Sequence, residues 1–415
     1  MNKFYYKIAT AISTASLLAG SIVPGVYGGT TITISGNGSD SYNKANVDVD
    51  QTTYVSQTNE ANVQNTVYAD AKTGDNKAND NTGGDVSIET GDATSNVTIE
   101  NSLNSNVAQV NPCCPGDTTL KITGNGSDSY NKIDVDINQD KDTGTLVEQG
   151  NLANVNNYVD ADAKTGKNKA NDNTGGDVSI ETGDADIDVE ISNALNANSA
   201  TIGGSGSNDI DIEISGNGSD SKNKVYFDLD ILTWLTQWNE ANVQNTVYAD
   251  AKTGKNKAND NTGGDVSIET GDADVNVDVS NLANFNSADL DACECITDVD
   301  VKISGNGSDS KNKVDLDLEK ILGVEQANEF NCKDRVDACA EVYADAQTGK
   351  NKANDNTGDV DDPGIETGDA SVDVTVDNTA NANVLGDADL PDFDFPDLGD
   401  LNVNGLILLL LAIFS

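Results

Sequence analysis

AKTGDNKANDNTGGDVSIETGDA, residues 71–93, is the most informative segment of the sequence, because it returns along the chain nearly unchanged. It recurs at residues 163–185 and 251–273, and in an altered form at residues 346–370. A second marker, GNGSDS, begins at Gly36, Gly124, Gly216 and Gly305, so both markers return about every ninety residues. Four copies of one unit predict a tandem-repeat architecture, whose function usually resides in an extended surface rather than in one cleft.

Each unit contains segments in which apolar and polar residues alternate. In the first unit, Ile32 and Ile34 precede the GNGSDS turn, and Val47 and Val49 follow it. A longer alternating run covers residues 55–71. Alternation and β-branched enrichment indicate strands that are buried on one face, and no stretch of the repeats has convincing helical spacing. We therefore expect an all-β fold.

The favoured architecture is an elongated β-solenoid-like tandem repeat of four units of about 90 residues, arranged end to end. Each unit holds roughly four strand–turn–strand segments of about twenty residues, a length that suits one coil. Some sixteen coils, rising about 4.8 Å each, predict a rod on the order of 75–80 Å. Recurring Asn residues are expected to form hydrogen-bonded ladders. The alternative is a string of four β-sandwich domains, although these normally need larger core residues than Ala, Val and Ile.

The chain divides into six segments on this interpretation. They are a signal peptide at 1–28, repeat units at 29–117, 118–208, 209–297 and 298–388, and an acidic, proline-containing linker with a short hydrophobic tail at 389–415. The first segment combines two lysines, an apolar stretch and small residues for cleavage, as secretory signals do. Export predicts a secreted or extracellular protein, attached to the cell surface on one interpretation.

The hydrophobic tail has two interpretations. Its apolar residues 406–414 are too few to span a bilayer, which needs about twenty. The tail is either the beginning of a truncated membrane anchor or a complete segment used for attachment or assembly.

The charge of the chain narrows the classes of function. The sequence carries 70 acidic and 24 basic side chains, a formal charge of −46 and no histidine. This charge opposes binding to nucleic acid or anionic lipid. The lack of histidine excludes Ser–His–Asp and Cys–His nucleophile systems and His-based zinc sites. Carboxylate pairs for glycoside hydrolysis need an apolar cleft, whereas the carboxylates here fall in repeating turns. We therefore expect a protein that is not an enzyme.

Calcium is the one cofactor that the sequence suggests, because hard cations prefer carboxylate and carbonyl oxygens. The segment NDNTGGDVSIETGD supplies the same four carboxylates in each of the first three units. They are Asp80, Asp85, Glu89 and Asp92, then Asp172, Asp177, Glu181 and Asp184, then Asp260, Asp265, Glu269 and Asp272. The spacing matches neither an EF-hand nor the nonapeptide of calcium-binding β-rolls. The alternative is that Asp and Asn form turns and a soluble face.

Six cysteines lie outside the repeated pattern. They are Cys113, Cys114, Cys293, Cys295, Cys332 and Cys339. An even number in an exported chain predicts disulfides that act as structural staples, although six cysteines allow fifteen pairings. A C-x-C metal or redox site is the alternative, but no further ligand cluster supports it.

The third unit carries an aromatic segment that the other units lack. Tyr226 and Phe227 lie there with Trp234 and Trp238, the two tryptophans of the chain. An aromatic patch on a polar surface is a candidate contact for a ligand or partner, for example for sugar rings. The alternative is a locally thicker core.

Two resemblances complete the sequence interpretation. GNGSDSYNKANVDVDQ, residues 36–51, and QTNEANVQN, residues 57–65, resemble the strand–arc–strand repeats of curlins, which are secreted amyloid fibre subunits. The match covers about a third of the repeat, and the repeat length and acidity of this chain differ from those of curlins. The chain as a whole resembles the tandem-repeat surface proteins rich in Asn, Asp, Thr and Gly that occur in uncultivated bacteria.

We therefore expect a non-enzymatic, secreted or cell-surface structural or adhesive repeat protein, such as a stalk, coat component or adhesin. The resemblance to curlins implies an extracellular fibre subunit as the alternative. A carbohydrate-binding or carbohydrate-active protein is a more distant one. The sequence does not identify the partner, which on these interpretations is a second copy of the chain or a cell-surface polymer.

Overall fold

A computed structural model describes residues 4–8, 17–22, 30–110, 117–139, 144–203, 208–290, 296–332, 339–358 and 364–386. These residues form strands joined by turns, and none of them is helical. Within the same ranges there is accordingly no helix with the length and apolar character needed to cross a membrane. The prediction of an all-β, elongated, solenoid-like repeat is confirmed.

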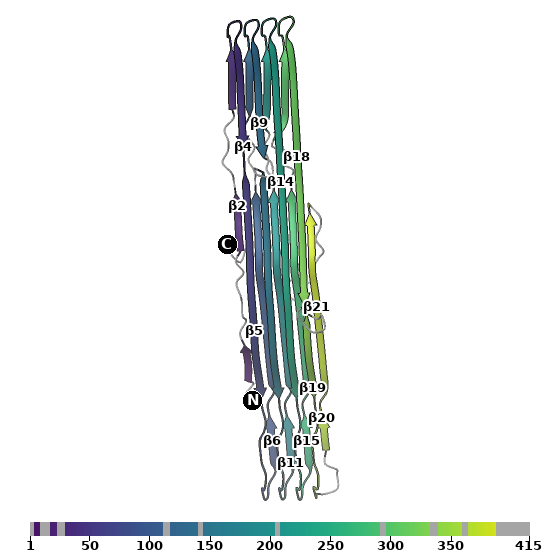
Figure 1. The fold of residues 1–415 in the computed structure, drawn as a ribbon. Helices are drawn as coiled ribbons and strands as arrows, with labels where there is room; N and C mark the ends of the chain where they lie inside the picture. The colour runs from purple at the N-terminus through teal and green to yellow at the C-terminus, as the bar shows by residue number, and fades with distance from the viewer. Residues whose placement is uncertain are drawn as a thin grey trace.

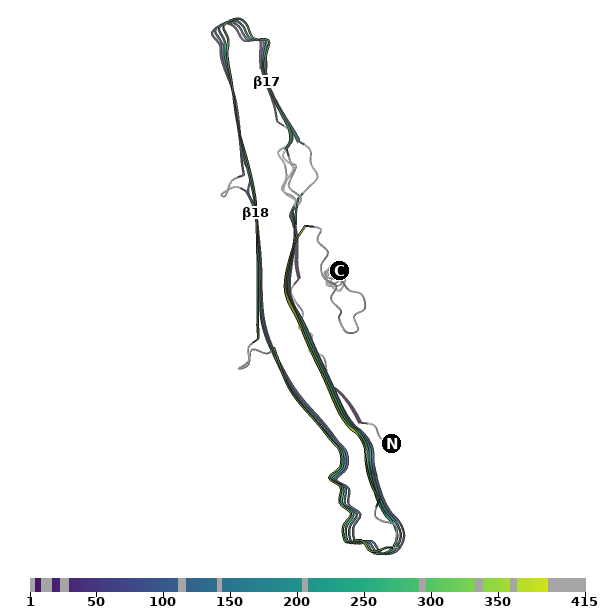
Figure 2. The ribbon, with the colours of Figure 1, turned by 90° about the vertical axis from the view of Figure 1, so that its right-hand side faces the viewer.

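Each repeat unit forms one long, flattened turn of chain, which we call a coil. In coil 1, β3 (Thr30–Ser35) leads into the GNGSDS turn at one end of the molecule. The chain then returns along the molecule through β4 (Tyr42–Asp50) and β5 (Thr53–Lys72). After an irregular arc at the opposite end, β6 (Val86–Thr90) and β7 (Ala93–Val110) run back (Figures 1 and 2).

The other three coils repeat this path. Coil 2 consists of β8 (Thr118–Thr123), β9 (Tyr130–Gln139), β10 (Thr145–Lys164), β11 (Val178–Thr182) and β12 (Ala185–Ile202). Coil 3 consists of β13 (Asn208–Ser215), β14 (Lys222–Lys252), β15 (Val266–Thr270) and β16 (Ala273–Leu290). Coil 4 consists of β17 (Ile296–Ser304), β18 (Lys311–Cys332), β19 (Ala340–Gln347), β20 (Gly364–Thr367) and β21 (Ala370–Leu385).

The coils lie side by side, and equivalent residues pair in parallel register. Val155 of coil 2, for example, pairs with Val63 of coil 1 and with Val243 of coil 3. One wall of the molecule is a seven-stranded sheet built from β4, β5, β9, β10, β14, β18 and β19. The opposite wall contains three sheets, and each of these also takes a strand from every coil. The alternative of four separate sandwich domains is therefore wrong, because no unit has a sheet of its own.

Two details of the predicted solenoid are also wrong. A coil contains a whole repeat unit rather than about twenty residues. Paired residues of the first three coils are therefore 88 or 92 positions apart in the sequence. The units stack sideways rather than end to end, so the long axis follows the strands. The 31 residues of β14 alone extend about 100 Å at about 3.3 Å per residue. The physical reason is that near-identical units form ladders of identical side chains when they pair in register.

The core is a thin layer between the two walls (Figure 2). Alternate residues of each strand face this layer, and the apolar ones form five clusters along its length. Buried amides separate some of these clusters. Asn59 on one wall donates a hydrogen bond to Asn106 on the other at 2.8 Å, and Asn65 donates one to Asn101 at 3.1 Å. The Asn ladders expected from the sequence thus lie within the core as well as at the turns.

The predicted unit boundaries fall close to strand starts. Units were expected to begin at 118, 209 and 298, and β8, β13 and β17 begin at Thr118, Asn208 and Ile296. The 389–415 segment lies outside the described residues.

Parts of the predicted signal segment are described as strands. β1 (Phe4–Ile8) and β2 (Leu17–Ile22) pair with β7 of coil 1, on the edge that faces away from coil 2.

Candidate functional surface

The twelve carboxylates proposed for calcium form rows across the stack of coils. Asp177 donates its main-chain N–H to the Asp85 carboxylate at 3.1 Å, and Asp265 repeats this contact to Asp177 at 2.9 Å. Asp184 and Asp272 continue the row that begins at Asp92, through equivalent contacts of 3.2 and 2.9 Å. Asp85, Asp177, Asp92 and Asp184 therefore each accept a hydrogen bond from the backbone of the next coil.

The remaining members of the set lie elsewhere. Glu89, Glu181 and Glu269 are exposed and pair in register across β6, β11 and β15. Asp80, Asp172 and Asp260 occupy left-handed turn positions, with φ values of 60°, 59° and 57°. Among the described residues, no group of three or more His, Cys, Asp or Glu side chains is placed to hold a metal ion. The recurring acidic positions thus act as turn formers and backbone acceptors in this fold, and the sets do not converge on a calcium site within each unit.

Stacking of carboxylates perturbs Asp186, which the sequence did not single out. Its pKa is raised to about 6, first by burial and then by the charges of Asp184, Asp274, Asp92 and Asp272. Asp186 pairs in register with Asp274 on the neighbouring strand, so two carboxylates meet at the spacing of adjacent strands. In-register pairing of similar units therefore places carboxylates on adjacent strands next to each other, where they repel.

The predicted aromatic patch is divided between two faces of β14. Phe227 is 2% exposed and belongs to the core. Trp234 and Trp238 are on the outer face, 41% and 39% exposed. Their rings cover Gly323 on β18 and Gly150 on β10, where a side chain of any size would collide with them. Glycine on the neighbouring strands thus makes room for the two tryptophans.

Tyr226 makes a different contact. Its ring lies between Lys132 and Lys313, whose Nζ atoms are 4.6 and 4.9 Å from the ring centre. Two cations on one aromatic ring are a favourable arrangement in this strongly acidic chain.

A column of tyrosines, which the sequence interpretation missed, crosses the outer face of the seven-stranded sheet. Tyr68, Tyr158, Tyr248 and Tyr343 contact one another in order, with ring centres 5.8, 5.8 and 4.8 Å apart. Tyr68, Tyr248 and Tyr343 are 67%, 40% and 53% exposed. The signal was present as a Tyr in each unit near the Ala-Asp-Ala segment. Tyr248 and Tyr343 pair in register, whereas Tyr158 lies two residues before the register of Tyr68 and Tyr248 and reaches their rings diagonally.

A shallow open groove of about 370 Å³ lies on the same sheet, N-terminal to the tyrosine column. Its polar lining consists of amides, among them Asn62, Gln64, Asn154, Asn156 and Asn242. Asn242 donates to Asn154 at 3.0 Å, and Asn154 donates to Asn62 at 2.8 Å. The outer face therefore presents rows of amides beside rows of aromatic rings. An open surface of this kind suits an extended polar ligand better than a small molecule that needs an enclosing pocket.

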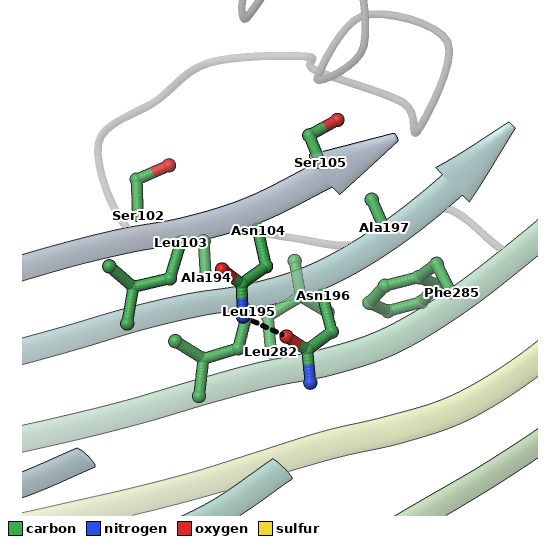
Figure 3. A pocket seen from close by; sticks show the side chains of 10 residues that line it. All are labelled: Ser102, Leu103, Asn104, Ser105, Ala194, Leu195, Asn196, Ala197, Leu282 and Phe285. Atoms are coloured by element: carbon green, nitrogen blue, oxygen red, sulfur yellow. Dashed lines mark hydrogen bonds between the residues drawn. The ribbon is translucent and has the colours of Figure 1, made fainter. Parts of the chain in front are cut away.

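A partly open space on the opposite wall is too small for a ligand. Leu103, Leu195, Leu282 and Phe285 are among its lining residues, and its volume is about 20 Å³ (Figure 3). This is close to the size of one water molecule. Asn104, which donates to Asn196 at 3.0 Å beside this space, has a left-handed φ of 60°.

One of the predicted disulfides is present among the described cysteines. Cys332 at the end of β18 and Cys339 before β19 are bonded, with Cα atoms 4.4 Å apart. Cys113, Cys114, Cys293 and Cys295 lie outside the described residues.

Comparisons with known proteins place no relative beside this chain. No family model matches the sequence, and neither a curated protein nor a solved structure is similar to it at a significant level.

Proposed function

We propose that this chain is a non-enzymatic structural or adhesive protein of the extracellular space or cell surface, acting as a stalk, coat component or adhesin. One observation carries the proposal: in-register stacking converts side chains of the repeat into straight rows on a stiff, elongated body. Repeated rows suit contacts with an extended partner, whereas catalysis needs a few converging groups.

The wall that bears the tyrosine column supports the adhesive part of this proposal. Exposed aromatic rings beside amide donors and acceptors are the usual components of a surface that binds sugar rings. A carbohydrate polymer is therefore the second candidate partner, and the Trp234 and Trp238 rings on the same sheet extend the aromatic surface. The charge of −46 makes an uncharged polysaccharide a better ligand than an acidic one.

Localisation tests the first part of the proposal. Cells that express the native gene should carry the protein in the surface or secreted fraction, accessible to an added protease in intact cells. Recovery only from the cytoplasmic fraction of intact cells would contradict an extracellular role.

Pull-down with insoluble neutral polysaccharides, such as cellulose and chitin, tests the second part. Tyr248→Ala should reduce retention at least several-fold, because it interrupts the column at its centre. Ser267→Ala, a small change at an exposed position of β15 on the opposite wall, is the matched control. Equal retention of the native chain and Tyr248→Ala would remove the tyrosine column as the contact.

A further inference from the structure

We infer that a second copy of this chain stacks on coil 4, so that its coil 1 continues the ladder in the same parallel register and head-to-tail assembly follows. This partner would make the proposed structural protein a filament subunit, and only that use of the assembly rests on the proposed function. Its evidence is the contrast between the two ends of the stack.

Coil 4 exposes core-facing residues that the other coils bury. Val374 and Val376 on β21 are 41% and 40% exposed, whereas Val277 and Val279, their partners on β16, are 0% and 1% exposed. The same contrast holds on the other wall. Leu316 on β18 is 50% exposed, and its partner Phe227 is 2% exposed. Each coil covers the core-facing side chains of the one before it, and no described residues cover those of coil 4.

The amide ladders have a direction that makes their ends complementary. Asn37, Asn125 and Asn217 each donate from Nδ2 to the Oδ1 atom of the next member, at 3.1, 2.9 and 3.0 Å. The last member is Asn306, and its Nδ2 atom is buried without a hydrogen-bond partner. A buried donor without a partner destabilises the end of the stack, because it has lost its hydrogen bonds to water. The Asn37 Oδ1 atom of a second copy, in the same register, would accept its hydrogen bond.

Space for a further coil is present at the other end of the stack. A Cβ atom on Gly126 would lie closer than 3.0 Å to the Ser39 backbone of coil 1, and Gly218 and Gly307 are equally tight against the coil before each of them. Gly38, the equivalent residue of coil 1, has nothing within 4 Å of such an atom. In the stacked assembly, Gly38 of the second copy would meet the Ser308 backbone of the first.

The occupant is therefore a copy of this chain rather than another protein. Coil 1 of the second copy carries the same residue types at these positions as coil 3, with which coil 4 already pairs. In the same register, Tyr343 would meet Tyr68, Asn328 would meet Asn59, and Gln326 would meet Gln57. A donor end and an acceptor end on one molecule give a heterologous contact, which repeats without closing and produces a filament. Exposed strand edges are known templates for such pairing.

Part of the receiving edge is occupied in the full chain. β1 and β2 pair with β7, where β21 of a second copy would pair. The full chain is therefore expected to assemble slowly and to assemble faster after these strands are removed. A protease site introduced between residues 23 and 29 allows this removal after the full chain has folded.

The test compares cleaved and uncleaved protein by sedimentation and electron microscopy, at 0.5 M sodium chloride to screen the charge. We expect the cleaved native chain to form filaments whose long strands run across the filament axis. The cleaved Gly38→Val chain should keep its melting temperature and lose at least ten-fold in the assembled fraction. A native chain that stays monomeric after cleavage, or a Gly38→Val chain that assembles as well as the native one, overturns the inference.

A second variant pair tests the opposite end. Val374→Lys places a charge among the core-facing residues of β21, and Thr375→Lys places it on the outer face of the same strand. Both positions are exposed in the single molecule. Val374→Lys should block assembly and Thr375→Lys should not, whereas equal effects contradict an in-register contact. A monomeric chain that still binds polysaccharide and resides at the cell surface would overturn the stacking while leaving the proposed function intact.

Discussion

At the scale of single residues, buried asparagines connect the two walls of the coil. Asn198 donates to Asn239 and to Asn286, both at 3.0 Å, and accepts hydrogen bonds from Asn106 at 2.9 Å and Asn151 at 2.8 Å. Such a network stabilises the fold only while each member has its partners. A bulky apolar residue at this position would leave several buried amides without a partner.

The first prediction follows from this network. Asn198→Ala should lower the free energy of unfolding by about 2–3 kcal/mol, because it removes acceptors and donors from buried amides. Asn156→Ala is the matched control, since Asn156 lies on the exposed outer face of β10. Urea unfolding measured by circular dichroism compares the two. Equal losses would mean that the buried ladder contributes no more than an exposed amide.

The second prediction concerns the Asp186 carboxylate. Its pKa is about 6 in the folded chain and ordinarily 3.8, so the folded state binds the proton more tightly than the unfolded state does. Stability from this group is therefore highest below about pH 4, and falls as the pH rises to about 6. Two pKa units correspond to nearly 3 kcal/mol, which partial exposure reduces to about 1 kcal/mol.

Asp186→Asn should therefore raise the melting temperature at pH 7.5 and leave it unchanged at pH 3.5. The control is Asp289→Asn, because Asp289 is exposed and its partner on β12 is the uncharged Thr201. If both variants give the same gain at pH 7.5, the effect is a general reduction of net charge rather than relief at Asp186.

Among the elements, the irregular arc of each coil, which follows β5, β10, β14 and β19, depends on glycine where neighbouring coils approach closely. Gly166 and Gly349 both adopt left-handed backbone, with φ values of 98° and 89°. A Cβ atom on Gly166 would also collide with the backbone of Gly254, whereas one on Gly349 would meet only the Thr367 methyl group at 3.4 Å. Alanine at Gly349 would therefore cost backbone strain alone, whereas alanine at Gly166 would cost the same strain and a collision between coils.

The third prediction uses this pair. Gly349→Ala should cost about 1–2 kcal/mol, the strain of a left-handed residue with a side chain. Gly166→Ala should cost at least about 2 kcal/mol more, because the neighbouring coil must move. Chemical unfolding of both variants measures the difference. Equal costs would show that the coils have room to separate at the arc.

The strands themselves were predictable, and their pairing was not. Alternation at Ile32, Ile34, Val47 and Val49 correctly identified strands with one buried face, because that pattern depends only on local geometry. Sequence cannot tell whether such strands pair within a unit or between units. Near-identical units at distances of 88 or 92 residues favour pairing between units, because core-facing Asn residues such as Asn43 and Asn59 then meet Asn131 and Asn151.

The candidate surface was less predictable for the same reason. Trp234 and Trp238 were recognised from composition, but Phe227 faces the core, since residues of opposite parity on one strand lie on opposite faces. The tyrosine column needs the register before its rings can be placed together. The acidic positions were read as possible ligands, and the structure shows that several are backbone acceptors between coils.

At the scale of the whole molecule, parallel register places like charges beside each other along every acidic row. The formal charge is −46, and adjacent strands are only about 4.8 Å apart, well within the Debye length of about 8 Å at physiological salt. Folding therefore gathers charges that are further apart in the open chain. Any ion that screens them stabilises the folded state.

The fourth prediction is that calcium acts on this chain through ionic strength. Calcium chloride and sodium chloride should raise the melting temperature equally when their ionic strengths are matched, because the described residues contain no cluster of carboxylates that would coordinate the ion. Thermal unfolding across a series of both salts measures this. A larger shift with calcium that reaches saturation at low millimolar concentration would instead show specific sites, and Asp85→Asn and Asp177→Asn would then test whether the Asp row supplies the ligands.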